Sequence, residues 1–241
     1  MDAIRTENLT KKYGLGWRKG RLLALDKLNL RVREGEVYGL LGPNGSGKST
    51  TLKCILDLVA PTEGEAWMFD VPCHKVESRL HVGFLPENPY FYKYLTGVET
   101  LEFYGKLCGL GGGALRKRID ELFDLVGLAH ARDRHLKGYS KGMLQRIGLA
   151  QAMIHDPKLL LLDEPTSGVS AEEKFATMDR VIHAVAPDAA TIVFVEHDME
   201  IVSRYADRVV AFYQGRILAD GEPGHVLKDQ EVRRYVTGGA K

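Results

Sequence analysis

The sequence predicts an α/β fold with a largely parallel central sheet and an inserted helical lobe, and three patterns carry this prediction. Short apolar segments typical of buried strands alternate with amphipathic helical segments near both ends of the 241-residue chain. The middle of the chain has a helical period and no convincing strand. A glycine-rich turn follows an early apolar strand and leads directly into a helix. We expect a core lobe from residues 1–87 and 155–241 and a helical subdomain from residues 88–154, together forming one domain.

The glycine-rich turn lies between two of the predicted elements. Val37–Leu41 is a short apolar run typical of a buried strand, and Lys48–Leu58 has the pattern of a helix. Strand, loop and helix in this order are the setting that a phosphate-binding loop needs.

Apolar residues follow a helical period from Thr96 to Leu136. One face of a helix is formed by five residues spaced at i, i+4, i+7, i+8 and i+11, namely Leu115, Ile119, Leu122, Phe123 and Val126. Strand patterns return at Leu159–Asp163, Thr191–Val195 and Val209–Phe212. A second helical face lies between the first two of these strands and consists of Phe175, Met178, Ile182 and Val185. This alternation is typical of βαβ units and therefore of parallel strands.

The composition is that of a globular chain without an extended charged surface. Hydrophobic residues make up 44% of the sequence, and 33 basic residues stand against 32 acidic ones. A formal net charge of +1 gives no field that would gather nucleic acid, so no nucleic-acid partner is expected. The chain has no apolar run of the roughly 18 residues that cross a bilayer, and no secretory signal. Its scattered cysteines and histidines have no disulfide or zinc spacing, and we expect a cytoplasmic protein.

Residues 42–50 match the phosphate-loop pattern GxxxxGK[ST]. Small residues in such a loop let backbone N–H groups point at phosphate oxygens, and the following helix presents its positive N-terminal end. We expect Lys48 to reach the β- and γ-phosphates and Ser49 to place its hydroxyl on Mg²⁺. The predicted nucleotide-binding residues of this loop are Gly42, Pro43, Asn44, Gly45, Ser46, Gly47, Lys48, Ser49 and Thr50.

A second motif consists of the apolar strand Leu159–Leu162 and the two carboxylates that follow it. The strand carries Asp163 to the carboxyl edge of the sheet, where its carboxylate can hold Mg²⁺. Because alternate residues on a strand face opposite ways, Glu164 is free to polarise a water for attack on the γ-phosphate. We therefore predict that Asp163 serves the metal and that Glu164 is the general base.

Together with Tyr139–Met143 and Val195–Asp198, these two motifs resemble the ATP-binding subunit of an ABC transporter. The resemblance covers about residues 4–219 and implies a P-loop NTPase core with a parallel central sheet, an N-terminal antiparallel β portion and an inserted helical subdomain. It implies an ATPase that uses ATP and Mg²⁺ and works as a head-to-tail dimer with a second copy or a homologous ATP-binding subunit. It also implies an integral membrane permease as partner and a peripheral position on the cytoplasmic face of the cell membrane.

The resemblance also assigns roles to single residues. Ser140 and Gly142, at the start of a helix predicted over Lys141–Ile154, resemble the signature motif that contacts the γ-phosphate held by the other subunit. His197 resembles the switch histidine that senses the γ-phosphate, and Tyr13 resembles the aromatic residue that stacks on adenine. The implied catalytic residues are Glu164, His197 and Lys48.

Several positions depart from the usual family pattern. Glu87 stands where the family usually has a glutamine that coordinates Mg²⁺, and a carboxylate can fill the same position, so the expected metal ligands are Ser49, Glu87 and Asp163. Lys141 and Met143 replace the usual signature residues. Ser170 lacks the carboxylate that usually links the two active sites of the dimer, so an ATP-binding module without turnover is one alternative.

The direction of transport and the partner rest on weaker cues. The signature and Glu87 resemble those of exporters, whereas Glu196–Met199 and Gly215–Gly221 resemble those of amino-acid importers, and we lean to export. An aromatic cluster lies where the family's membrane subunit inserts a coupling helix, although ordinary packing would also explain it: Pro89, Tyr90, Phe91, Tyr92, Tyr94 and Leu95. A soluble ATPase switch in a non-transport complex is the alternative function, but the coiled-coil insertion or second nucleotide-binding domain usual in such proteins is not visible.

Overall fold

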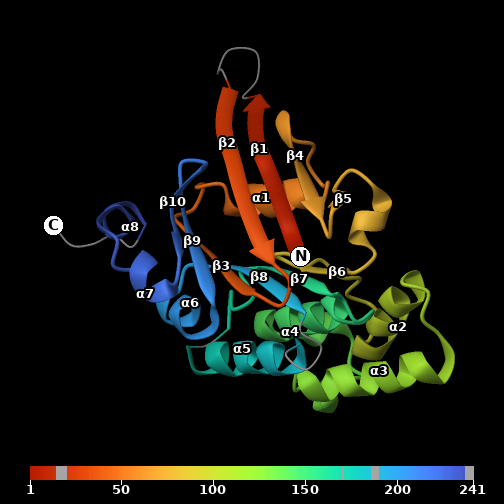
Figure 1. Ribbon diagram of the computed structural model, residues 1–241. Helices are drawn as coiled ribbons and strands as arrows, with labels where there is room; N and C mark the ends of the chain where they lie inside the picture. The colour runs from red at the N-terminus through yellow and green to blue at the C-terminus, as the bar shows by residue number, and fades with distance from the viewer. Residues whose placement is uncertain (15–20, 170, 186–189, 237–241) are drawn as a thin grey trace. The chain divides into compact units, whose positions relative to one another are not determined.

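The chain forms two compact units, of which Figure 1 shows the helices and strands. The computed structural model describes residues 1–14, 21–169, 171–185 and 190–236. Unit 1 contains Met1–Leu80 and Thr191–Lys241, and unit 2 contains His81–Ala190. Unit 1 therefore holds the glycine-rich loop, and unit 2 holds the helical middle of the chain.

Unit 1 begins with a four-stranded antiparallel sheet in the order β2-β1-β4-β5. Figure 1 shows β1 and β2 as long neighbouring strands with β4 on the other side of β1. The buried hydroxyl of Thr6 ties β1 to β2, because it donates to the carbonyl of Leu28 at 3.0 Å and accepts the N–H of Leu30 at 2.9 Å. The N-terminal antiparallel β portion is thus confirmed. Its strands are β1 Asp2–Gly14, β2 Arg21–Arg33, β4 Glu63–Met68 and β5 Val71–Pro72.

The glycine-rich loop follows a strand of a second sheet in unit 1. Strand β3 (Val37–Leu41) runs parallel to both β8 (Thr191–Glu196) and β9 (Arg208–Tyr213). Strand β10 (Arg216–Gly221) pairs antiparallel with β9. Almost every residue of β3 and all of β8 are buried, as expected for parallel strands covered on both faces. The strand predicted over Val37–Leu41 is confirmed residue for residue.

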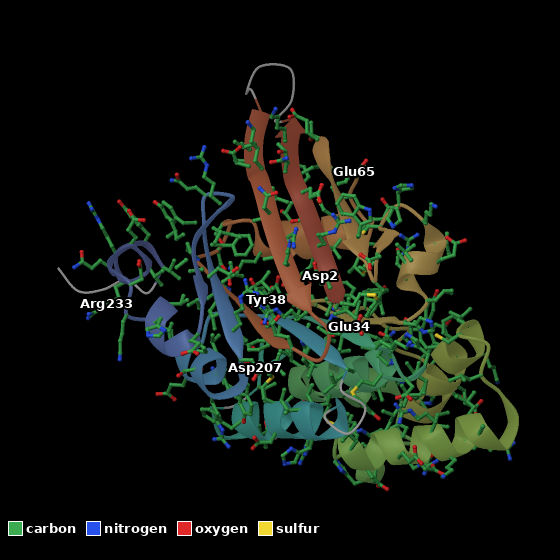
Figure 2. All side chains as sticks on the ribbon, in the orientation of Figure 1. Asp2, Glu34, Tyr38, Glu65, Asp207 and Arg233 are labelled. Carbon is green, nitrogen blue, oxygen red and sulfur yellow. The ribbon has the colours of Figure 1, made fainter. Side chains whose placement is uncertain are left out.

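Polar contacts fix the beginning of β3. The N–H of Val37 donates to Oδ2 of Asp207 at 2.9 Å, and Asp207 is labelled with Tyr38 in Figure 2. The guanidinium carbon of Arg208 lies 5.3 Å from the ring centroid of Tyr38, and Nε and Nη2 of Arg208 each donate to a carboxylate oxygen of Asp220 at 2.7 Å. Burial raises the pKa of the Tyr38 phenol. These contacts hold in place the strand that positions the loop.

Four short helices complete unit 1, together with a 3₁₀ turn. Asp198 and Asp229 cap α6 and α8, each accepting two backbone N–H groups of the first turn. Helix α1 ends earlier than the predicted Leu58, because Asp57 adopts a left-handed backbone with φ of 56° that closes the helix. These elements are α1 Lys48–Ile55, the 3₁₀ turn Val76–Arg79, α6 Met199–Tyr205, α7 Pro223–Val226 and α8 Gln230–Tyr235.

Unit 2 combines a parallel pair of strands with four helices. Strands β6 (Val82–Leu85) and β7 (Leu159–Asp163) pair in parallel, and the predicted strand at Leu159–Asp163 is confirmed. The helices are α2 Gly97–Leu107, α3 Gly112–Leu125, α4 Lys141–Ala152 and α5 Ala171–Val185, with 3₁₀ turns at Ala129–Ala131 and Leu136–Gly138.

Local sequence explains where the helices of unit 2 begin and which side they bury. Helix α2 starts at a capping box, in which Thr96 and Glu99 each accept the other's backbone N–H, at 3.2 and 2.7 Å. These hydrogen bonds hold the pKa of the Glu99 carboxyl below its usual range. The predicted apolar face of α3 is confirmed, since its four helical members are buried: Leu115, Ile119, Leu122 and Phe123.

The predicted α/β fold with an inserted helical subdomain is confirmed. The predicted lobe boundaries after residues 87 and 154 stay a prediction, whereas the chain contacts change after residues 80 and 190. Among the described residues, no helix combines the length and the apolar character needed to span a bilayer.

Candidate functional site

Residues 42–47 form a tight loop between β3 and α1, and two of its glycines are required by their surroundings. A Cβ on Gly42 would lie 2.5 Å from the carbonyl oxygen of Phe212, and one on Gly47 would lie 2.7 Å from that of Ala24. Both glycines have positive φ angles, 157° and 114°, that other residues rarely adopt. A Cβ on Gly45 would meet no heavy atom within 4 Å, so this part of the loop borders open space.

The buried ammonium of Lys48 lies over the carbonyls of this loop. The side chain is 5% exposed, and its Nζ donates to the carbonyl oxygens of Gly42 at 2.6 Å and of Pro43 at 3.0 Å. The N–H of Ser46 donates to the same Pro43 oxygen at 3.1 Å, which closes the turn. Lys48 also begins α1, so a positive side chain and a helix N-terminus coincide here.

The other side of the loop is tied to two strands through Gly215. The N–H of Gly215 donates to the carbonyl of Ser46 at 2.8 Å, and its own carbonyl accepts the N–H of Asp26 at 3.0 Å. A Cβ on Gly215 would lie 2.8 Å from the carbonyl oxygen of Ala24, so glycine is needed for this contact. Sequence reasoning missed this residue. The turn formed by Gln214 and Gly215 between two strand patterns was the available signal.

Several groups of this loop are suited to binding an anion. The Ser46 hydroxyl is buried and has no hydrogen-bond partner among the described residues. Open space at Gly45, the ammonium of Lys48 and the start of α1 together provide what phosphate oxygens require. The loop therefore fits the phosphates of a nucleotide.

A cleft of about 710 Å³ borders the loop at Gly45. Its lining mixes apolar residues, one tyrosine and polar groups, among them an ion pair in which Arg216 Nε lies 2.7 Å from Oδ2 of Asp26. Tyr13 lies near the end of β1, half-buried, opposite Leu22 in the strand register, and Lys11 Nζ is 5.1 Å from its ring centroid. The cleft is lined by Leu22, Leu23, Asp26, Gly45, Tyr213, Gln214, Arg216, Ile217 and Leu218.

His197 is exposed directly after β8, the strand that runs beside β3. In the register of these strands Leu41 lies opposite Glu196, so His197 and the beginning of the glycine-rich loop share one edge of the sheet. The next residue, Asp198, caps α6. Unit 1 thus contains three of the predicted features, namely Tyr13, the loop and His197.

In unit 2, the two predicted carboxylates end strand β7. Asp163 is the last residue of the strand and is 4% exposed. Glu164 follows with φ of 54°, a left-handed conformation that is unusual for a residue other than glycine and often marks functional sites. The carbonyl of Glu164 accepts Nε2 of Gln145 at 3.1 Å. Gln145 is a supporting residue that sequence reasoning missed, since nothing in the pattern of α4 pairs it with β7.

The predicted signature residues lie at the start of α4 and next to the turn that follows β7. Ser140 is the N-cap of the helix and accepts the N–H of Met143 at 3.2 Å. A Cβ on Gly142 would lie 3.7 Å from the carbonyl oxygen of Gly168, and Nζ of Lys141 donates to Oγ of Ser167 at 3.5 Å. Unit 2 therefore brings the signature and the Asp163–Glu164 turn side by side.

Glu87 is exposed after β6 in unit 2, and its Oε1 accepts Nδ2 of Asn88 at 3.1 Å. The predicted aromatic cluster follows it along the chain. Ser170 lies outside the described residues.

A family model for ABC transporters matches residues 25–167, which is more than half of the sequence. The chain belongs to the ABC transporter family. It is 40% identical over 234 residues to an uncharacterized ABC transporter ATP-binding protein of Nostoc sp., covering 96% of this chain and 70% of that protein. It is 34% identical over 236 residues to the bacitracin transport ATP-binding protein BcrA of Bacillus licheniformis, covering 97% and 73%.

Solved structures of ABC cassettes have the same fold. The dimeric post-hydrolysis state of the ATP-binding cassette MJ0796, bound to ADP and Pi, superposes with a TM-score of 0.84 at 27% identity, covering 91% of this chain and 98% of that one. CbiO1 of Clostridium perfringens, part of the ABC transporter complex cbiONQ, gives 0.81 at 27% identity, covering 97% and 93%. The protein is thus an ATP-binding cassette that hydrolyses ATP to drive transport, and the alternative of a non-transport switch is not supported.

Proposed function

We propose that this ABC cassette drives export of a substrate through a separate membrane permease. The observation that supports export is that two similar proteins are named for export or for drug resistance. The Nod factor export ATP-binding protein I of Cupriavidus metallidurans is 31% identical over 231 residues, covering 95% of this chain. The daunorubicin/doxorubicin resistance ATP-binding protein DrrA of Streptomyces peucetius is 36% identical over 226 residues.

Nucleotide binding is assigned to the glycine-rich loop and Tyr13. Backbone N–H groups of residues 44–50 surround the phosphates, Lys48 contacts the β- and γ-phosphates, and Tyr13 stacks on adenine. A bound Mg²⁺ ion would neutralise charge on the phosphates. The chemistry of hydroxyl and carboxylate oxygens suits this ion, and the ligands we assign are Ser49, Glu87 and Asp163.

Hydrolysis is assigned to Glu164 with His197. The carboxylate of Glu164 accepts the proton of the attacking water. The left-handed backbone of Glu164 turns the chain away from the strand that ends at Asp163. The side chain of His197 contacts the γ-phosphate and orients it. Support for these roles comes from the order of the motifs and from the position of each residue immediately after a buried strand.

A second cassette completes the site. Ser140 and Gly142 leave the N-terminus of α4 at the surface of unit 2, and such a helix end favours an anion. We infer a head-to-tail dimer in which this end contacts the γ-phosphate held by the partner cassette, whether a second copy or a homologous subunit. The dimeric cassettes among the solved relatives support this assembly.

The exposed aromatic cluster of unit 2 is assigned to the permease. Phe91 is buried, with its ring centroid 6.1 Å from that of Tyr104, whereas Tyr90 and Tyr94 are 85% and 68% exposed. Tyr92 and Phe103 are also exposed, with ring centroids 6.0 Å apart. Large exposed rings next to one another are typical of protein interfaces. This contact would hold the cassette on the cytoplasmic face of the membrane.

The experiment is purification of the tagged cassette from native membranes in mild detergent, followed by mass spectrometry. We expect a multi-span membrane protein in near-equal amount. A Tyr90→Ser/Tyr94→Ser variant should lose that partner, whereas Lys117→Ala, a change at an exposed lysine of α3, should keep it. Recovery of soluble proteins alone would contradict the permease assignment. ATP-dependent uptake of the transported substrate into inverted vesicles, but not into right-side-out vesicles, would establish export.

A further inference from the structure

The turn that begins at Glu164 has an uncommon backbone conformation. Glu164 has φ of 54°, in the left-handed region that residues with a Cβ seldom occupy. Such a conformation costs free energy and persists where the surrounding structure holds it. The carbonyl of Glu164 accepts the N–H of Ser167 at 3.0 Å, which closes the turn directly after β7.

Helix α4 supplies a second donor to the same carbonyl. Nε2 of Gln145 donates to the Glu164 oxygen at 3.1 Å, and Gln145 is only 2% exposed. Because a buried amide cannot turn to water instead, this hydrogen bond is costly to lose. The helix and the turn are therefore joined at the backbone of the residue assigned as general base.

One helical turn earlier, Lys141 contacts the other end of the same turn. Residues 141 and 145 are four apart and lie on one face of α4. A Cβ built on Gly168 would lie 2.5 Å from Cδ and 2.7 Å from Cε of Lys141, so the aliphatic stem of the lysine lies directly on this glycine. Nζ of Lys141 donates to Oγ of Ser167 at 3.5 Å, which is long for a hydrogen bond. The contact of Lys141 with the turn is therefore mainly one of packing.

The conformation of this turn matters for catalysis. The rotamers open to a side chain depend on the backbone conformation of its residue, so the backbone of Glu164 limits where its carboxylate can lie. A general base must lie within hydrogen-bond reach of the group from which it takes a proton. A displacement of about 1 Å can cost roughly a hundredfold in rate. Groups that fix the Glu164 backbone therefore affect the rate of hydrolysis.

We propose that Gln145 and Lys141 are positioning residues for hydrolysis, which hold the turn at Glu164 so that its carboxylate faces the attacking water. This inference rests on the proposed role of Glu164 as general base. Gln145 acts through the backbone carbonyl of Glu164, and Lys141 acts through the packing of its stem on Gly168.

The first test is Gln145→Met, which keeps the length of the buried side chain and removes its donor. We expect kcat for ATP hydrolysis to fall roughly 10- to 100-fold, because the carboxylate of Glu164 is less well placed. Affinity for ATP, titrated with EDTA to prevent turnover, should stay within about twofold of wild type. Gln151→Met makes the same change elsewhere on α4 and should alter neither quantity. Turnover at the wild-type level in Gln145→Met would overturn the inference.

The second test asks whether Gln145 acts through Glu164. Adding Gln145→Met to Glu164→Gln should lower single-turnover phosphate release no further, because the group that Gln145 positions is already gone. A further loss as large as in the single variant would show that the glutamine acts elsewhere, and would overturn the inference. Wild-type turnover in Glu164→Gln itself would instead refute the general base on which the inference rests.

Lys141 is exposed, so its replacement tests the inference even where Gln145→Met does not fold. Lys141→Ala removes the stem from Gly168 and should lower kcat roughly three- to tenfold, with ATP affinity kept. Lys141→Met keeps most of the stem and should lose less turnover. Wild-type turnover in Lys141→Ala, or equal losses in the two variants, would overturn the role of the stem. Lys117→Ala, at an exposed lysine of α3, is the control and should leave turnover unchanged.

Discussion

Phosphate contacts are proposed both for the glycine-rich loop of unit 1 and for the signature end of α4 in unit 2, but the two sites differ in how complete they are. The loop buries Ser46, Gly47 and Lys48, holds its lysine over its own carbonyls and is tied to β2 through Gly215. The signature end is an exposed helix N-terminus capped by Ser140. We therefore expect the loop to bind nucleotide within one chain. We expect the helix end to contact a γ-phosphate only when a second cassette brings its own bound nucleotide.

The largest effect in this comparison is expected at the lysine of the loop. Lys48→Ala removes the ammonium that would meet the β- and γ-phosphates, so nucleotide affinity should fall by roughly a hundredfold or more. Calorimetric titration with ATP in the presence of EDTA measures this directly and without turnover. Micromolar affinity in the variant would mean that the loop does not hold the phosphates.

The next effect separates binding from chemistry. Glu164→Gln keeps the shape of the side chain but removes the proton acceptor, so turnover should fall by about 10² to 10⁴ while ATP affinity is kept. Phosphate release measures the turnover, and nucleotide titration of the same preparation measures the ATP affinity. Wild-type turnover in Glu164→Gln would remove Glu164 from its role.

Replacing one glycine in each of the two regions should change the free energy of unfolding in opposite directions. Gly47→Ala places a Cβ 2.7 Å from a backbone oxygen at φ of 114°, so it should lower the free energy of unfolding by about 2 kcal/mol or more. Gly142→Ala has room, with its nearest atom at 3.7 Å, and should raise that free energy by about 0.5–1 kcal/mol. Chemical denaturation measures both. Equal effects would contradict the difference drawn between the loop and the helix end.

The smallest effect is a dependence on pH in unit 2. Burial lowers the pKa of His155 below its ordinary value of 6.5 and outweighs the backbone hydrogen bond with Val82 and the negative charge of Asp156, which act in the opposite direction. As pH falls below about 6.5 the unfolded chain therefore takes up this proton first, and stability decreases. The decrease between pH 7 and pH 5 should be smaller in His155→Phe than in the wild type. An identical pH profile in both proteins would show that His155 is not its source.

Much of the fold follows from short-range pattern. The apolar run Val37–Leu41 and the spacing of the α3 face predicted their elements correctly, because both depend on side-chain periodicity alone. Helix ends were less accurate, since α1 ends at Ile55 through the backbone conformation of Asp57 rather than through any change of polarity.

The candidate site could be predicted only as far as its motifs reach. The loop residues and the Asp163–Glu164 pair were found from local spacing, and the structure places the loop directly after β3 and the pair at the end of β7, both of which are buried strands. Gly215 and Gln145 were missed because their contacts, to Ser46 and Glu164, join segments distant in sequence. The unpartnered hydroxyl of Ser46 is equally invisible to pattern, since it depends on three-dimensional burial.

The central claim, that the loop of one cassette works with the signature end of another, is tested most directly by mixing two inactive variants. Lys48→Ala lacks a working loop, and Gly142→Asp places a negative charge at the signature end. Each variant alone should have no ATPase activity. In a mixed dimer the intact loop of one chain meets the intact signature of the other, so mixing should restore a clear fraction of wild-type phosphate release. A mixture that stays as inactive as its components would contradict the account.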